Sequence, residues 1–110
     1  MTDNKTTLPQ PRRIHPIRKA LKPVQDRIGH LNEAAVFLAA RAPRESDCTA
    51  LSEELTFKRG MLAETRVLFD AAVSELPEKY HRDSRLSDTR AAIERLANAL
   101  DSIEAQLTTT

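Results

Sequence analysis

Residues 46–76 carry more apolar surface than one neighbouring helix can cover. At helical spacing, two apolar stripes run side by side along this segment, and together they span about half of its circumference. A helix with so wide an apolar arc has to be covered from two sides, so the segment is predicted to be the middle helix of a three-helix bundle. The first stripe contains Leu51, Leu55, Leu62, Phe69 and Leu76, with Val73 beside it, and the second contains Phe57, Met61, Leu68 and Ala72.

The preceding segment, residues 16–41, is predicted to supply one of the two covering helices. Its apolar residues alternate spacings of four and three without a gap, which is typical of a bundle or coiled-coil seam. Pro23 interrupts the backbone hydrogen bonding, but the seam continues in phase through it, which favours a helix that begins at Pro16 and kinks over one that begins at Pro23. The seam consists of Ile17, Leu21, Val24, Ile28, Leu31, Ala35 and Leu38.

The third predicted helix covers residues 83–107, with Asp83 or Ser84 as its cap. Pro77 ends the middle helix. Lys58-Arg59-Gly60 has the pattern of a helix stop, but the apolar stripe stays in phase across Gly60, which favours one continuous helix. The seam of the third helix consists of Leu86, Thr89, Ile93, Leu96, Leu100, Ile103 and Leu107.

These patterns predict an all-α fold, an antiparallel three-helix bundle of coiled-coil type. Residues 16–110 form its single domain, and residues 1–15 form an extended basic N-terminal arm. Short connections force sequential helices to run antiparallel. The chain has 2 Gly, no Trp, 3 Phe and 1 Tyr among its 110 residues, which disfavours an all-β domain.

Cysteine content and hydropathy indicate a cytoplasmic protein. The single Cys48 has no second cysteine with which to form an internal disulfide, and a reducing compartment is the usual setting for such a chain. No apolar run approaches the roughly 18 residues that a membrane-spanning helix needs. We therefore expect no membrane partner.

Charge divides the chain into two unlike parts. Residues 1–22 contain six basic side chains and one acidic one, a net charge of +5, whereas residues 23–110 contain eleven basic and fifteen acidic ones, a net charge of −4. Three interpretations of the basic arm stay open: a solubilising tail, a linear motif that orders on a protein partner, and a segment that contacts nucleic-acid phosphates. The candidate binding residues here are Arg12, Arg13, Ile14, Arg18 and Lys19.

A second candidate binding surface lies in the apolar stretch 34–40. Val36 and Phe37 point away from the seam of their helix. Either the adjoining loop or the arm covers Phe37, or the two side chains form an exposed patch that binds a partner or a second copy. A homo-oligomer therefore remains open.

The sequence predicts no catalytic residue, cofactor or metal site. It has no Gly-rich phosphate loop, CxxC or HExxH motif, and His30 with Glu33 supplies only one of the two pairs that a di-iron bundle needs. Lys58 projects into the apolar arc, where its stem is expected to pack while its ammonium group reaches solvent; a buried, paired charge is the alternative. The expected function is non-catalytic protein binding, as an accessory subunit, adaptor or inhibitor of a larger assembly. The alternative is nucleic-acid binding or regulation through the arm.

Overall fold

The part of the chain that the structure describes is mostly helical. This computed structural model describes residues 15–44 and 48–108. They form three long helices, α2 (Pro16–Arg41), α3 (Cys48–Glu75) and α4 (Ser84–Thr108), with a short 3-10 helix, η1 (Glu78–Tyr80), before α4. No β-strand occurs within those residues, so the prediction of an all-α chain with three helices is confirmed.

Helix α2 begins at Pro16 and continues through Pro23. The residue before it, His15, caps the helix, because its Nδ1 atom accepts a hydrogen bond of 3.2 Å from the backbone N–H of Ile17. Pro16 occupies the first turn, where its missing N–H costs no helical hydrogen bond. The apolar seam that runs in phase across Pro23 was therefore the correct guide to where this helix begins.

Helix α3 runs without a break across Gly60. No glycine among the described residues has a positive φ, so Gly60 does not act as a left-handed helix cap. The predicted start at residue 46 lies outside the described residues. Beyond Pro77, η1 occupies part of the connection between α3 and α4.

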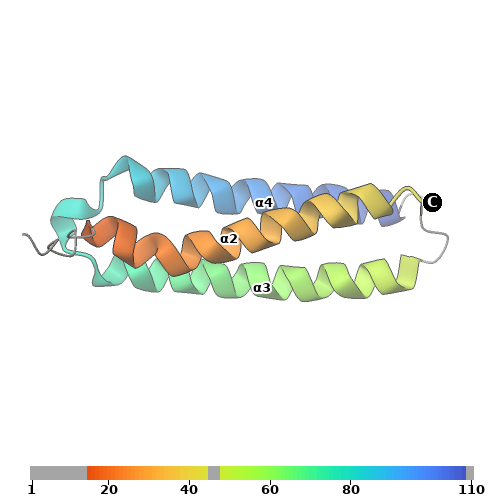
Figure 1. The fold of residues 1–110 in the computed structure, drawn as a ribbon, viewed down its shortest axis with the longest axis horizontal. Helices are drawn as coiled ribbons and strands as arrows, with labels where there is room; N and C mark the ends of the chain where they lie inside the picture. The colour runs from red at the N-terminus through yellow and green to blue at the C-terminus, as the bar shows by residue number, and fades with distance from the viewer. Residues whose placement is uncertain (1–14, 45–47, 109–110) are drawn as a thin grey trace, which may run out of the picture.

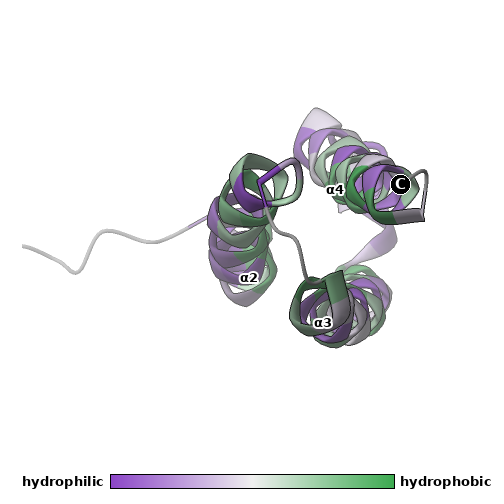
Figure 2. Ribbon diagram, turned by 90° about the vertical axis from the view of Figure 1, so that its right-hand side faces the viewer, coloured by the Kyte–Doolittle hydropathy of each residue, from purple (hydrophilic) through white to green (hydrophobic). Residues whose placement is uncertain are grey.

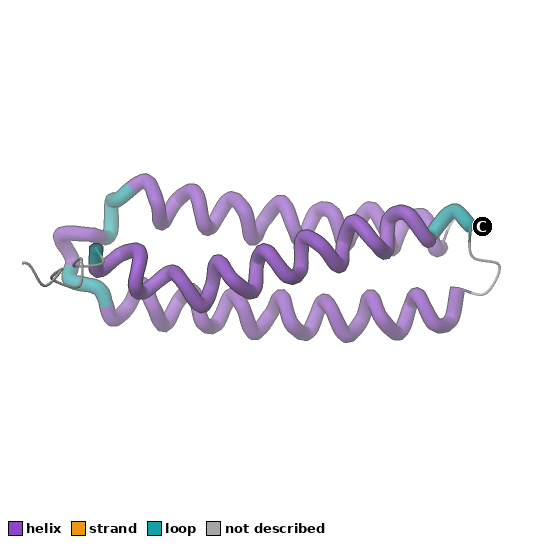
Figure 3. The backbone as a smooth tube through the Cα atoms, viewed as in Figure 1, coloured by secondary structure: helices purple, strands orange, loops and turns teal. Residues whose placement is uncertain are grey.

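The three helices pack against one another as a bundle, and each contacts both of the others. Viewed along the bundle, they stand at the corners of a triangle (Figure 2). Figure 1 shows α3 returning along α2, and α4 running in the same direction as α2. The backbone tube in Figure 3 shows that helix makes up nearly all of the described chain, with short connections at the ends of the bundle.

The hydrophobic core follows the three predicted seams. Ile17, Leu38, Leu51, Ile93 and Leu100 are among its fully buried members. Thr65 and Thr89 are buried with them, and each hydroxyl donates a hydrogen bond to the carbonyl one turn earlier, at 2.8 Å and 2.7 Å. These bonds satisfy the two hydroxyls without a partner from another helix.

The second predicted stripe of the middle helix is only partly covered. Met61, Leu68 and Ala72 are half-buried, but Phe57 is 65% exposed. The expectation that neighbouring helices would cover this stripe is therefore wrong at Phe57. Lys58, beside it, is half-buried with Nζ 5.4 Å from the Phe57 ring centroid, which agrees with a packed stem and an outward ammonium group.

Candidate interaction surface

The predicted binding residues occupy two separate places. Arg12, Arg13 and Ile14 lie outside the described residues. Arg18 and Lys19 are exposed near the start of α2, whereas Val36 and Phe37 lie near its end. At 1.5 Å per residue, about 27 Å of helix separates Lys19 from Phe37, so the structure does not bring the basic and apolar candidates together.

Val36 and Phe37 are each 71% exposed. The described loop after α2 therefore leaves Phe37 uncovered, and the exposed-patch interpretation fits the described residues. Successive helical residues are about 100° apart, so the two side chains face different neighbours. Val36 borders a hollow between α2 and α4 that also includes Ala39, Ala99 and Ser102.

Phe37 lies on the other side of α2, toward α3, and level with Phe57. An ion pair of 3.3 Å between Arg41 Nη1 and Glu54 Oε1 shows which levels of α2 and α3 lie side by side. Stepping back one turn from Arg41 on α2 reaches Phe37, and stepping forward about one turn from Glu54 on α3 reaches Phe57. Two exposed phenyl rings thus stand at the same level of the outer α2–α3 face.

A second ion pair crosses the same face nearer its middle. Arg27 Nη1 lies 3.5 Å from Glu64 Oε1. Beyond it, toward the start of α2, the face opens into a hollow of about 490 Å³ lined mainly by small or apolar side chains. Ala20 and Pro23 of α2 and Ala71 and Ala72 of α3 line this hollow, and Lys19 and Glu75 also border it.

The α3–α4 face is ionic instead. Arg59 Nη2 lies 2.7 Å from Asp101 Oδ1 and also pairs with Glu104, while Arg66 Nη1 lies 2.7 Å from Glu94 Oε2. The hydrogen bond that Arg66 donates to Glu94 lowers the pKa of Glu94, and those that Arg59 donates to Asp101 and Glu104 raise the pKa of Arg59. These shifts come from surface ion pairs of a kind common between packed helices.

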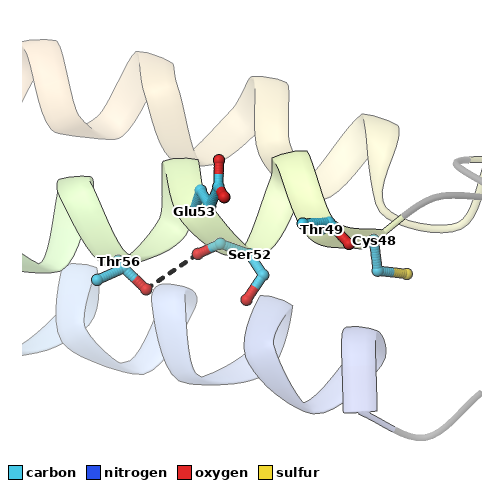
Figure 4. Close-up of a pocket in the computed structure, with 5 residues that line it drawn as sticks. All are labelled: Cys48, Thr49, Ser52, Glu53 and Thr56. Carbon is cyan, nitrogen blue, oxygen red and sulfur yellow. Dashed lines mark hydrogen bonds between the residues drawn. The ribbon is translucent and has the colours of Figure 1, made fainter.

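A further hollow lies along the first turns of α3. Figure 4 shows Cys48, Thr49, Ser52, Glu53 and Thr56, which all come from this one helix. The Cys48 sulfur points away from Ser52 and Glu53, and the Thr56 hydroxyl is occupied by a hydrogen bond of 3.0 Å to the Ser52 carbonyl. Among these five residues, none places a base beside the thiol, as an activated nucleophile would need.

Within residues 15–44 and 48–108, no group of three or more His, Cys, Asp or Glu side chains is placed to hold a metal ion. None of the helices there has the length and apolar character needed to cross a membrane.

Sequence reasoning missed the α2–α3 face as a surface. It assigned Phe57 to a covered stripe, although this ring is 65% exposed. The helical phase of Phe57 was readable from the sequence, but how far α2 reaches around α3 depends on the packing of the two helices. No protein family, curated protein or solved structure matches this chain.

Proposed function

We propose that the chain is an antiparallel three-helix bundle with a basic N-terminal arm, and that it acts as a small non-catalytic protein-binding module. In this role it is an accessory subunit, adaptor or inhibitor that docks on a larger assembly in the cytoplasm. The observation that carries the proposal is the exposure of Phe37 and Phe57 at one level of the α2–α3 face. Exposed aromatic side chains at a helix groove are typical anchors of protein interfaces.

The arm is proposed as a second contact. Arg18 and Lys19 are exposed where α2 begins, directly after the basic segment that contains Arg12, Arg13 and Ile14. A basic segment with a few apolar residues suits a partner with an acidic surface beside a hydrophobic groove.

Binding of nucleic acid through the arm is the alternative function. Its support is the net charge of +5 over residues 1–22, because Lys and Arg side chains bind phosphates and release counterions. The body of the chain carries the opposite sign, so such binding would be confined to the arm.

Two measurements separate the two functions. One is the capture of protein partners from the native host, and the other is the retention of DNA over a range of salt concentrations. Phe37→Ser should reduce capture of a protein partner and leave DNA retention unchanged. Deletion of residues 1–13 should abolish salt-dependent DNA retention if the alternative holds. Val67→Ser is the matched control, since it removes an equally exposed apolar side chain elsewhere on α3. Equal capture by the Phe37→Ser variant and the parent chain would contradict the proposed function.

A further inference from the structure

The outer α2–α3 face offers apolar contacts at both of its ends. Near the start of α2, Ala20 on α2 and Ala71 on α3 border the hollow of about 490 Å³. Toward the other end, the rings of Phe37 and Phe57 are exposed. At 1.5 Å per residue, about 26 Å separates Ala20 from Phe37 along α2. A straight helix of about five turns laid along the groove between α2 and α3 would therefore reach both ends.

The two edges of this groove carry opposite charges. At three levels, a basic side chain of α2 and an acidic side chain of α3 lie on its two sides. Arg41 and Glu54 form an ion pair, as do Arg27 and Glu64, and Lys19 and Glu75 border the hollow. Asp26 and Glu33 lie one position further round α2, on its outer side. The α2 edge of the groove is therefore basic and the α3 edge acidic.

The other two faces of the bundle do not have this combination in the described residues. The hollow of about 420 Å³ between α2 and α4 is bordered by uncharged side chains. The α3–α4 face has ion pairs, but its hollow is only about 160 Å³, and most of the side chains around it are charged. Of the three faces, the α2–α3 face thus joins apolar anchors to edges of opposite sign.

We propose that this groove binds one amphipathic helix of the partner protein, with acidic residues along one flank and basic residues along the other. The apolar side of this helix enters the hollow and lies beside the phenyl rings. Its acidic flank lies along α2 and its basic flank along α3. Uncharged flanks would cover the two ion pairs without replacing their lost hydration. The inference rests on the proposed protein-binding function and names the kind of partner that the same surface takes.

The spacing of the charges matches a heptad repeat. Arg27 and Arg41 are 14 residues apart, which is two heptads, and Ala20 lies one heptad before Arg27. In a bound helix with the same repeat, the residues of one flank recur at the level of Ala20, Arg27 and Arg41 in turn. One simple repeat of acidic and basic residues therefore meets both edges of the groove.

The charges also determine the direction of the bound helix. Figure 2 views the bundle from the end of α2, and α2, α3 and α4 follow one another counterclockwise. Seen from outside with α2 running upward, α3 therefore lies to the right, and the left edge of the groove is basic. A right-handed helix that runs upward with its a and d positions inward has its g positions on the right, as α2 does with Arg27 and Arg41. A bound helix with acidic g and basic e positions therefore runs downward, parallel to α3.

Three labelled synthetic peptides test the charge requirement. Each has about three heptads with leucine at a and d. The first has Glu at g and Lys at e, the second Glu at both, and the third Lys at both. In fluorescence anisotropy at low salt, the first should bind the full chain at least about tenfold more tightly than the others. Ala71→Arg, which fills the hollow, should weaken this binding by a similar factor, and Val67→Ser should leave it unchanged. Equal binding of the three peptides, or none of the first, would overturn the inference.

Fluorescence quenching tests the direction. In a Cys48→Ser background, a fluorophore is attached at Glu53→Cys or Ser74→Cys, which are exposed positions near the two ends of α3. The first peptide carries a quencher at its N-terminus. Because this peptide should run parallel to α3, quenching should be stronger at Glu53→Cys than at Ser74→Cys. Stronger quenching at Ser74→Cys would contradict the proposed arrangement.

Exchanging the charges across the groove should reverse the bound peptide. The exchange consists of Lys19→Glu, Arg27→Glu, Arg41→Glu, Glu54→Arg, Glu64→Arg and Glu75→Lys. It keeps the net charge and the attraction within each pair, and circular dichroism checks that the chain stays helical. Quenching should then be stronger at Ser74→Cys, and quenching that stays at Glu53→Cys would overturn the inference. Capture of a native partner that still depends on Phe37 would leave the proposed function standing in that case, so the two can fail separately.

Discussion

The ring of His15 meets the ring of Tyr80 edge-on, with centroids 5.5 Å apart and ring planes at 71°. His15 also caps α2 through its bond to the Ile17 N–H, and Tyr80 closes η1 in the α3–α4 connection. One side chain thus caps the first described helix and contacts the connection between the other two. We expect the two roles of His15 to be separable.

A double-mutant cycle measures the ring contact. His15→Asn keeps an acceptor suited to the cap but removes the ring, and Tyr80→Ala removes the other ring. We expect a coupling free energy of about 0.5 kcal/mol, at the low end for aromatic pairs because His15 is exposed. His15→Ala should lose the cap as well and cost about 1 kcal/mol more than His15→Asn. Urea unfolding of the four cycle variants checks this, and zero coupling would show that the ring contact adds nothing.

The two glycines offer a test of helix continuity. Gly60 and Gly29 lie inside α3 and α2, and a Cβ added to either meets nothing within 4 Å. Alanine loses less backbone entropy on folding, so Gly60→Ala and Gly29→Ala should each raise the free energy of unfolding by about 0.5 to 1 kcal/mol. A lower melting temperature for Gly60→Ala would mean that α3 does not run through this position as a regular helix.

Truncation of phenylalanines on α3 should distinguish its buried and outer faces. Phe69 is 2% exposed and Phe57 is 65% exposed on the same helix. Phe69→Ala should cost about 3 to 5 kcal/mol, and Leu62→Ala about 2 to 5 kcal/mol, measured by chemical denaturation. Phe57→Ala should cost less than about 1 kcal/mol. Similar costs for both phenylalanines would contradict the burial pattern described above.

Most of the fold could be predicted from the spacing of apolar residues, because the face of a helix on which a residue lies depends only on its position along that helix. This spacing indicated that α2 begins at Pro16 rather than Pro23 and that α3 passes through Gly60, since both choices depended on whether apolar spacing stayed in phase. It also placed Thr89 in the third seam. Thr65 was overlooked because its hydroxyl makes it polar, although its bond to the Met61 carbonyl lets it lie in the core.

The interaction surface was less predictable, because it depends on the register between helices. The sequence alone indicated that Phe37 points away from the seam of its helix. It did not indicate that Phe37 lies level with Phe57. That relation follows from the Arg41–Glu54 and Arg27–Glu64 contacts, which join residues distant in sequence. A chain with 17 basic and 16 acidic residues could form many other ion pairs, so its composition does not predict which two of them join α2 to α3.

The start of α4 gives a prediction about pH. Asp83 caps this helix, because its Oδ1 accepts a 2.9 Å hydrogen bond from the Arg85 backbone N–H, and its two oxygens also accept bonds from the Arg85 guanidinium. The side-chain bond from Arg85, followed by the backbone bond, lowers the pKa of Asp83. Asp83→Ala should therefore lower the melting temperature at neutral pH, and Asp83→Asn should lower it less, since an amide oxygen still caps the helix.

The loss of melting temperature caused by Asp83→Ala should become smaller as the pH falls. A carboxyl group whose pKa is lowered on folding adds stability above its unfolded pKa, about 3.9 for Asp, and this stability is lost as the pH falls through the lower folded value. The difference in melting temperature between the parent chain and Asp83→Ala should stay constant from about pH 7 to about pH 5 and shrink below about pH 4. Asp83→Asn has no titrating group at this position. The difference in melting temperature between Asp83→Asn and Asp83→Ala should therefore stay nearly constant over the same pH range. A parent-to-alanine difference that persists undiminished to about pH 2 would show that the charge of Asp83 does not contribute to the cap.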